Sequence, residues 1–357
     1  MRSDAGAPAV NGTPEALPNR AQKAPWIAGL NRFEKPSARK VAIQLADTLL
    51  PYLGLLALMF LTIQWRVPYW VTLVLAVPAG ALLLRTFIFF HDCCHGSYVA
   101  SPTALKILGN VLGVLTFTPF DDWRHSHGIH HSTSGNLDKR GIGDVWTMTV
   151  AEYAASGWFR RALYRFYRHP AVMFGLGPIL SFIIMNRLPS RDPTKRRLLS
   201  VIATNAFIAG IILAVGFTLG FRSYLAVQIP VLLFGGAAGV WLFYVQHQFD
   251  PTYWARTGEW ESMDAAMQGS SYYKLPAVLQ WISGNIGLHH VHHLRPRIPN
   301  YNLQQCVDAT PELQLPNALT LWSSLRAVRY NVWDEERKVL LSFREMTRLL
   351  RQNPRTA

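Results

Sequence analysis

Histidines are the side chains of this protein whose spacing is most suited to chemistry. The sequence holds 12 histidines, and most of them gather in three short motifs, HDCCH, HGIHH and HHVHH. Positions i, i+3 and i+4 of a motif share one face of a helix. The histidines with this spacing are His91, His95, His127, His130, His131, His289, His292 and His293. His125 and His290 fall off that face, and we interpret them as polar neighbours of a site.

Eight converging imidazoles exceed what a structural zinc site needs. Such a site is closed by four ligands and usually recruits thiolates. Neutral imidazole suits iron, copper, zinc and nickel, and eight or nine such ligands can hold two ions with positions left open. The pattern therefore predicts a catalytic centre of two metal ions.

Four apolar segments must position these histidines. Hydrophobic residues make up 50% of the chain, and they form four runs of about 20 residues, the length that crosses a bilayer. The runs are residues 41–63, 69–90, 198–219 and 224–245. Short turns join the first pair and the second pair. The sequence therefore predicts an all-α integral membrane protein with two transmembrane hairpins and a cytosolic helical cap that holds the histidines.

The distribution of cations predicts the orientation of the hairpins. Each turn holds one arginine, whereas the opposite ends hold four cations in NRFEKPSARK and five in RLPSRDPTKRR. By the positive-inside rule, the turns face away from the cytoplasm, and the termini and large polar segments lie within it. The net charge of +14 then reflects cations near anionic headgroups, and no nucleic-acid motif accompanies it.

Two further apolar runs, residues 107–120 and 171–186, are too short to cross a bilayer. Gly or Pro interrupts both of them. We expect interfacial or re-entrant helices there.

The two ends of the chain are expected to lie outside the membrane domain. Residues 1–40 lack a signal-peptide pattern, and they predict a cytosolic tail that is disordered to about Trp26. The membrane domain is expected to cover residues 41–345, leaving residues 346–357 as a second tail. Apolar residues at helical spacing predict capping helices near the end of that domain. These helices are expected at residues 319–332 and 339–350.

The predicted topology places a ninth histidine beside the motifs. Segments 69–90 and 224–245 both run from outside to inside, so His91 and His247 follow their inner ends at the same depth. A lipid-like chain could reach this depth from the bilayer. A di-iron centre that oxidises an unactivated C–H bond fits these features best.

Longer stretches around the histidines carry a family resemblance. These stretches are HDCCHGS, WRHSHGIHHSTSGNLDKRGIGDVWT, VWLFYVQHQF and GNIGLHHVHHLRPRIPNYNL. They resemble the histidine boxes of integral-membrane fatty acid desaturases, most closely bacterial acyl-lipid desaturases, a group that includes delta-5 and omega-6 (delta-12) enzymes. The resemblance covers roughly residues 41–345. Cys94 is one departure, because many members have glycine there, but it leaves every histidine intact.

The resemblance implies a non-haem di-iron centre that uses O2 and two electrons to form a cis double bond in an acyl chain, with release of water. The implied iron ligands are His91, His95, His127, His130, His131, His247, His289, His292 and His293. The implied substrate is an acyl chain of a membrane glycerolipid, and the implied location is the bacterial inner membrane with the site on its cytoplasmic side. No dinucleotide fingerprint or HPGG haem motif is present, so electrons are expected from a separate protein such as ferredoxin.

Side chains near the motifs could orient the imidazoles by hydrogen bonds to their outer nitrogens. The candidates are Asp92, Asp138, Asp144 and Asn285. No catalytic acid or base is expected beyond the metal centre, and no substrate-binding residue is assigned. Arg85 stands out because charge at membrane depth is costly. Its side chain could reach the inner interface or meet a substrate headgroup.

Two alternatives stay open. A membrane di-iron hydroxylase or ketolase that acts on a carotenoid or sterol would use similar histidines, and its product would gain oxygen. A metal transporter would need polar ligands near the bilayer midplane, and the predicted spans place none there.

Overall fold

The computed structural model of the chain describes residues 25–315 and 318–352. It is mostly helical, and three continuous helical stretches are long and apolar enough to cross a membrane. They are α2 (Ala38–Gln64), α3 (Tyr69–His95) and the stretch Lys195–His247. Two bent helix pairs could raise the number of spans to five. The expectation of a mostly helical protein with membrane-spanning helices is confirmed.

The stretch Lys195–His247 consists of two helices. It contains α8 (Lys195–Val215), a π-helical turn Gly216–Gly220 and α9 (Phe221–His247). Its 53 residues would extend about 80 Å as one straight helix, whereas the apolar core of a bilayer is about 30 Å thick. Gly220 has a φ of 92°, a value that L side chains rarely adopt and that interrupts the helical path. We therefore treat α8 and α9 as the second hairpin.

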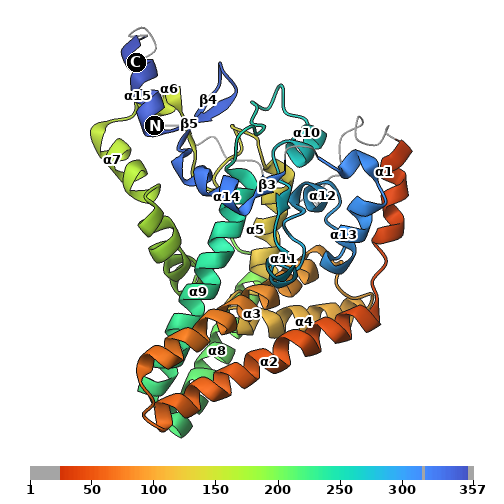
Figure 1. The fold of residues 1–357 in the computed structure, drawn as a ribbon, viewed down its shortest axis with the longest axis vertical. Coiled ribbons are helices and arrows are strands. Elements are labelled where there is room, and N and C mark those ends of the chain that lie inside the picture. Colours follow the sequence, from red (N-terminus) through yellow and green to blue (C-terminus); the bar gives the residue numbers. More distant parts are fainter. Residues whose placement is uncertain (1–24, 316–317, 353–357) are drawn as a thin grey trace, which may run out of the picture.

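Helix α3 is the central element of the bundle, because it packs against α2, α4 and α9. Gly96, with a φ of 72°, ends α3 in the left-handed conformation just after His95. The helix thus continues past its apolar part and carries the first histidine motif. In Figure 1, α2, α3, α8 and much of α9 form the lower part of the molecule, and the cap lies above them.

Two bent helix pairs flank the bundle. Helix α4 (Pro102–Leu115) meets α5 (Phe120–Thr133) at 94°, and α7 (Trp158–Tyr167) meets the segment Ala171–Arg187 at 63°. The latter segment contains π-helical turns at Ala171–Leu176 and Ile179–Ile184. The 14 residues of α4 extend about 21 Å, short of a span. That length supports an interfacial position for α4, which stays a prediction.

The cap consists of short helices and two small sheets. Its α-helices are α1 (Pro25–Gly29), α6 (Val150–Ala155), α10 (Ser262–Met267), α11 (Ala277–Ile282), α12 (His289–Leu294), α13 (Asn300–Asp308), α14 (Leu321–Ser324) and α15 (Phe343–Gln352). In one sheet, β4 (Val332–Asp334) pairs parallel to β1 (Met148–Thr149) and antiparallel to β5 (Val339–Leu341). In the other, β2 (Tyr273–Lys274) is parallel to β3 (Leu319–Thr320).

The prediction of a capping helix at residues 319–332 is wrong. This segment contains β3, α14, a 3-10 helix Leu325–Arg329 and the start of β4. The prediction for residues 339–350 is wrong at its start, where β5 precedes α15. Where the two segments meet in the sheet, Val332 and Trp333 of β4 are buried and pair with Leu341 and Leu340 of β5.

The expected disorder of the amino-terminal tail lies largely outside the described residues. The described part begins at Pro25, and the next residues pack against the body through the buried side chains of Ile27, Leu30 and Phe33. Helix α15 continues to Gln352, past the predicted domain end at residue 345.

Candidate metal centre

The structure brings nine histidines together in two groups. The five-imidazole group contains His91, His95, His127, His131 and His292, and the four-imidazole group contains His130, His247, His289 and His293. Within each group, one nitrogen of every ring lies within 4.8 Å of the others. Helix α3 supplies two of the nine, α5 and α12 three each, and α9 one. These are the nine histidines expected to act as ligands, and His125 and His290 lie outside both groups.

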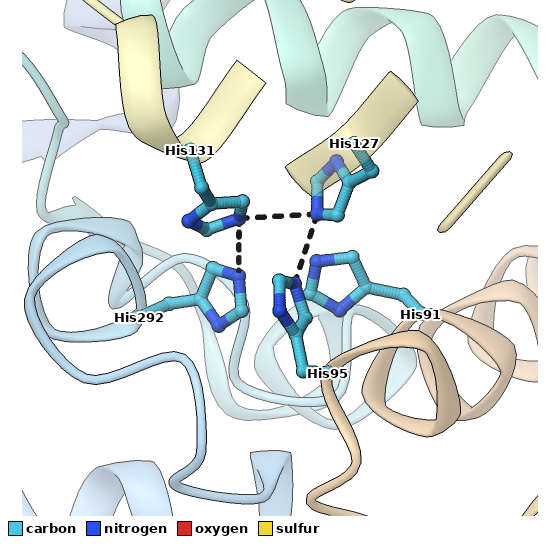
Figure 2. Close-up of side chains that lie close together, drawn as sticks. All are labelled: His91, His95, His127, His131 and His292. Atoms are coloured by element: carbon cyan, nitrogen blue, oxygen red, sulfur yellow. Dashed lines mark hydrogen bonds between the residues drawn. The ribbon is translucent and has the colours of Figure 1, made fainter. Parts of the chain in front are cut away.

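In the five-imidazole group, the rings converge from three helices, as Figure 2 shows. The Nε2 atom of His127 lies 2.9 Å from Nε2 of His95 and 3.1 Å from Nε2 of His131. Nε2 of His131 lies 3.1 Å from Nε2 of His292. His91 completes the group, with its ring centroid 4.5 Å from that of His292. The spacing of one helical turn within α3 and within α5 aims both rings of each pair at the same point.

The four-imidazole group is centred on His247, the last residue of α9. Its Nε2 atom lies 3.1 Å from Nε2 of His130 and 3.1 Å from Nε2 of His289. The ring of His293 lies 4.9 Å from that of His247, centroid to centroid. All four histidines are buried. The group thus joins α5 and α12 to the carboxyl-terminal end of α9, which is part of a candidate membrane span.

These nitrogen contacts test whether the groups fit metal ions. A neutral imidazole offers one N–H and one lone pair, so several Nε2 atoms about 3 Å apart cannot all be satisfied by shared protons. Further protonation is opposed, because burial, and then the neighbouring imidazoles, lower the pKa of His292 and His293 well below the usual range. A cation that accepts the lone pairs resolves this conflict. The groups are therefore suited to metal ions that prefer neutral imidazole.

Asp92 supports the five-imidazole group through its neighbour His91. Oδ1 of Asp92 lies 3.3 Å from Nδ1 of His91. Its Oδ2 accepts hydrogen bonds from the backbone N–H of Asn300 at 2.7 Å and from Nδ2 of Asn300 at 2.9 Å. Oδ1 of Asn300 in turn accepts from Nε2 of Gln44 on α2 at 2.8 Å. This buried network fixes the carboxylate that orients the His91 ring.

The four-imidazole group is supported by loops of the cap. Oδ1 of Asp144 lies 2.9 Å from Nδ1 of His130, and the carbonyl oxygen of Gly269 lies 3.2 Å from Nδ1 of His247. Next to Asp144, Gly143 has a φ of 73°, and a Cβ there would lie 2.9 Å from Cβ of His130. Glycine at this position therefore lets the loop bring Asp144 close to the imidazole.

The structure places the other two candidate supports, Asp138 and Asn285, away from the imidazoles. Asp138 accepts hydrogen bonds from Nη1 of Arg256 at 2.7 Å and from the backbone N–H of Thr257 at 2.8 Å. Nδ2 of Asn285 donates to the carbonyl oxygen of Asn300 at 3.1 Å. Asn285 therefore contacts Asn300, the partner of Asp92, and not an imidazole. Proximity in sequence to a histidine motif was the only signal for Asp138, and its loop carries the carboxylate elsewhere.

Asn300, Gln44 and Gly269 are contacts that the sequence analysis missed. Gln44 lies on an apolar helix, where a buried amide is a signal that a partner is needed. Asn300 begins α13 within the stretch quoted for the resemblance, but nothing in its local sequence indicates Asp92 as its partner.

His290 and Arg85 have structural roles in the described part of the chain. Nε2 of His290 bonds to the carbonyl oxygen of Leu313 at 2.9 Å, and burial lowers the pKa of His290 to about 4. The buried guanidinium of Arg85 donates to Oγ1 of Thr48 at 2.9 Å and lies 4.0 Å from the ring centroid of Trp281. Arg85 therefore ties α2 and α3 to α11, which precedes the third histidine motif.

A cavity of about 630 Å³ adjoins both imidazole groups. This volume lies within the range of about 300–1,000 Å³ that is typical of small-molecule sites. His91 and His127 of one group and His289 of the other line it. Its remaining walls come mainly from apolar residues of α3 and α9, from α5 and from residues 181–190. An apolar ligand in this cavity would lie beside the metal-binding nitrogens.

Comparison with known proteins agrees with this arrangement. Residues 65–325 match the family model described as "Fatty acid desaturase". The chain is 44% identical over 312 residues to a fatty acid desaturase of Bacillus subtilis (strain 168), covering 87% of this chain and 88% of that protein. Two proteins of Synechocystis sp. (strain ATCC 27184 / PCC 6803 / Kazusa) are also similar. The sn-1 acyl-lipid omega-3 desaturase (ferredoxin) is 27% identical over 64% of each chain, and the sn-1 oleoyl-lipid 12-desaturase is 25% identical over 76% of each.

Proposed function

The chain belongs to the fatty acid desaturase family and is an oxidoreductase, and from this premise we propose its substrate, its metal and its electron source. It introduces a cis double bond into an acyl chain of a membrane glycerolipid, with O2 as the oxidant and a non-haem di-iron centre. Two of the four electrons that reduce O2 to two waters come from the acyl chain, and two come from an external donor. The observation that carries this proposal is the position of two imidazole groups against one apolar cavity.

The nine grouped histidines would hold the two irons, five on one ion and four on the other. Iron bound there would supply the oxidising chemistry that removes hydrogen from an unactivated carbon pair. The protein's own part is positional. Asp92 and Asp144 hold His91 and His130 with Nε2 directed inward. The apolar cavity holds the acyl chain beside the site and excludes water from it.

A membrane-embedded substrate is supported by the outer wall of the cavity. Met185 and Leu188 line the cavity and are also 66% and 64% exposed. Apolar side chains exposed beside candidate membrane spans are suited to contact with lipid. Acyl-lipid substrates in the names of the two Synechocystis relatives agree with a glycerolipid. The cation distribution supports a site on the cytoplasmic side, and the Bacillus subtilis relative supports a bacterial membrane as the location.

The two external electrons come from a separate protein, ferredoxin or a similar carrier. The sequence lacks a dinucleotide fingerprint and an HPGG motif, so a nicotinamide or haem domain of its own is not indicated. Three distant relatives are named as ferredoxin-linked and one as cytochrome b5-linked. The net charge of +14 suits an acidic carrier.

The test is a fatty acid methyl ester profile, with double-bond positions, from an aerobic bacterial host that expresses the chain and a working electron donor. The intact protein is expected to yield a new unsaturated ester. His130→Ala is expected to abolish it, whereas the matched control His125→Ala, which lies outside both imidazole groups, is expected to retain it. An oxygenated acyl product would favour a hydroxylase, and product from His130→Ala at the wild-type level would remove His130 from the ligand set.

A further inference from the structure

The cavity continues beyond the imidazoles as a deep apolar limb between α3 and α9. Resting on the proposed function, we propose that this limb binds the methyl end of the acyl chain and that Gly239 determines how much of the chain can pass the metal centre. Gly239 is thereby a specificity-determining residue that acts on double-bond position and chain length.

The course of the limb follows from the register of two helices. Both α3 and α9 run from the outer turn to the imidazole level, and the Cβ positions of Gly235 and Gly239 face Gly80 and Leu84 respectively. Cavity-lining residues recur at helical spacing along both helices. They are Leu83, Leu84, Phe87, Ile88 and His91 on α3, and Leu232, Gly235, Gly236, Gly239, Val240, Leu242, Phe243 and Gln246 on α9. From His91 to Leu83 the limb therefore descends eight residues, about 12 Å.

The chemistry of the walls decides which end of an acyl chain the limb accepts. Beyond the imidazoles the limb is lined by Leu83, Leu232 and Phe182, together with glycines, and its polar lining near Phe182 is Ser181 and Asn186. Nδ2 of Asn186 already donates to the carbonyl oxygen of Phe117 at 3.2 Å. Asp122, the one carboxylate that lines the cavity in the described chain, lies on α5 one to two turns before His127, at the imidazole end. A carboxylate or glycerol headgroup in the deep part would lose its hydration without a charged partner among these lining residues. The methyl end of the substrate is apolar, so it loses no favourable hydration when it enters the deep part.

Glycines bring α9 close to its neighbours beside the deep part of the limb. A Cβ on Gly235 would lie 2.8 Å from the carbonyl oxygen of Gly80, and a Cβ on Gly236 would lie 2.8 Å from Cβ of Pro178. These two glycines are therefore required for close packing of α9 against its neighbours. Side chains at either position would disrupt the bundle before they changed the cavity.

Gly239 differs from its neighbours, because it has space for a side chain. A Cβ there would meet Cδ1 of Leu84 at 3.6 Å, an ordinary van der Waals contact, and nothing else within 4 Å. Since Gly239 also lines the cavity, a larger side chain would extend into the limb. It would separate the imidazoles from the part of the limb around Gly235, which lies one turn or about 6 Å deeper. Less of the methyl end could then pass the metal centre.

The experiment compares Gly239→Leu, Gly239→Ala and the control Gly210→Leu in the aerobic host. Gly210 on α8 is exposed, and a Cβ there would have no neighbour within 4 Å. Gly239→Leu is expected to move the double bond toward the methyl end, or to reduce conversion of long chains relative to short chains by about tenfold. Gly239→Ala is expected to give a smaller change in the same direction, and Gly210→Leu the wild-type pattern.

A second measurement separates this inference from the proposed function. Saturated fatty acids of graded length displace a fluorescent fatty acid from the purified proteins, and no turnover is needed. Gly239→Leu is expected to weaken the binding of long chains about tenfold more than that of short chains. Unchanged length dependence in both measurements would overturn the inference. If Gly239→Leu does not accumulate, the result for Gly239→Ala decides. A wild-type chain without a desaturated product would count against the proposed function alone.

Discussion

The two imidazole groups differ in how many histidines they contain and in what holds them. The five-imidazole group is linked through Asp92, Asn300 and Gln44 to α2, a helix of the membrane bundle. The four-imidazole group is linked through Asp144 and Gly269 to loops of the cap. The partner of the outer nitrogen of His91 is therefore tied to the bundle, whereas the partners of the outer nitrogens of His130 and His247 lie on loops of the cap, although His247 itself ends the bundle helix α9.

This difference indicates that the two metal positions differ in coordination and in stability. If the same metal occupies both groups, the four-imidazole group leaves one more coordination position for a non-protein ligand, as catalytic metal sites do. Loops with few buried contacts also open locally more easily than helices of a packed bundle. We expect the metal of the four-imidazole group to be the more exchangeable of the two.

The largest effect is expected from His247→Ala, which removes the central ligand of the four-imidazole group. Desaturation should fall at least 100-fold, because loss of a directly bonded ligand exceeds the about 10–100-fold cost of losing a partner that orients it. Iron per chain should fall from about two to about one, because the five-imidazole group keeps all its ligands. Metal analysis of the purified protein, beside the ester profile, checks this. Retention of two irons would contradict the assignment of His247 to a separate group.

The second prediction compares the two carboxylates that orient imidazoles. Asp144→Ala and Asp92→Ala should each reduce activity by about 10–100-fold, because each frees the outer nitrogen of a ligand. Asp144→Ala should also increase the rate at which a chelator removes iron more than Asp92→Ala does. The reason is that Asp144 supports the four-imidazole group, whose supports lie on loops of the cap. Equal rates of iron loss for the two variants would contradict the expectation that the metal of the four-imidazole group is the more exchangeable of the two.

The sequence was sufficient to identify features that depend on local spacing. Which histidines share a helical face follows from a repeat of 3.6 residues, and the structure brings those histidines together. The apolar helical stretches with membrane-spanning length follow from length and hydropathy in the same way, whereas their number as four separate spans stays a prediction. His247 followed from one further step, the equal depth of two segment ends.

Features that depend on distant contacts could not be predicted. Asp92 and Asn300 are 208 residues apart in sequence, and no local pattern links them. The helix predicted at residues 319–332 is wrong because both ends of the segment pair with distant strands: Leu319 and Thr320 pair with β2, and Val332 pairs with β1 and β5. Asp138 was chosen for its nearness to the second motif, but a turn carries its side chain to Arg256.

The third prediction tests the link from Asp92 to the bundle. Asn300→Ala removes the side-chain donor at 2.9 Å but leaves the backbone N–H, which donates at 2.7 Å. Activity should therefore fall only several-fold, on the order of 1 kcal/mol for one hydrogen bond to a charged group. Asp92→Ala measured under the same conditions is the reference. An Asn300→Ala variant as impaired as Asp92→Ala would mean that Asn300 does more than hold the carboxylate.

The smallest effect is expected from Asp138→Asn, which lies outside both networks. Hydrogen bonds from the N–H of Thr257 and from Arg256 lower the pKa of Asp138 to about 2. A carboxylate whose pKa is lowered on folding stabilises the folded state at pH values above its pKa in the unfolded chain, which is about 3.9. That stabilisation is lost as the pH falls from about 4 toward 2. Because this surface is exposed to solvent, screening keeps the contribution small.

Arg256 also keeps its second ion pair, with Glu335 at 2.7 Å, in the Asp138→Asn variant. Activity and iron content near neutral pH should therefore stay within about twofold of the wild type, as for most surface ion pairs. The ester profile and metal analysis check the expected activity and iron content. Thermal melts at pH 7 and at pH 3.5 check the small contribution of Asp138 to stability. A large loss of iron at neutral pH would show that the loop of Asp138 supports the four-imidazole group and is part of the site.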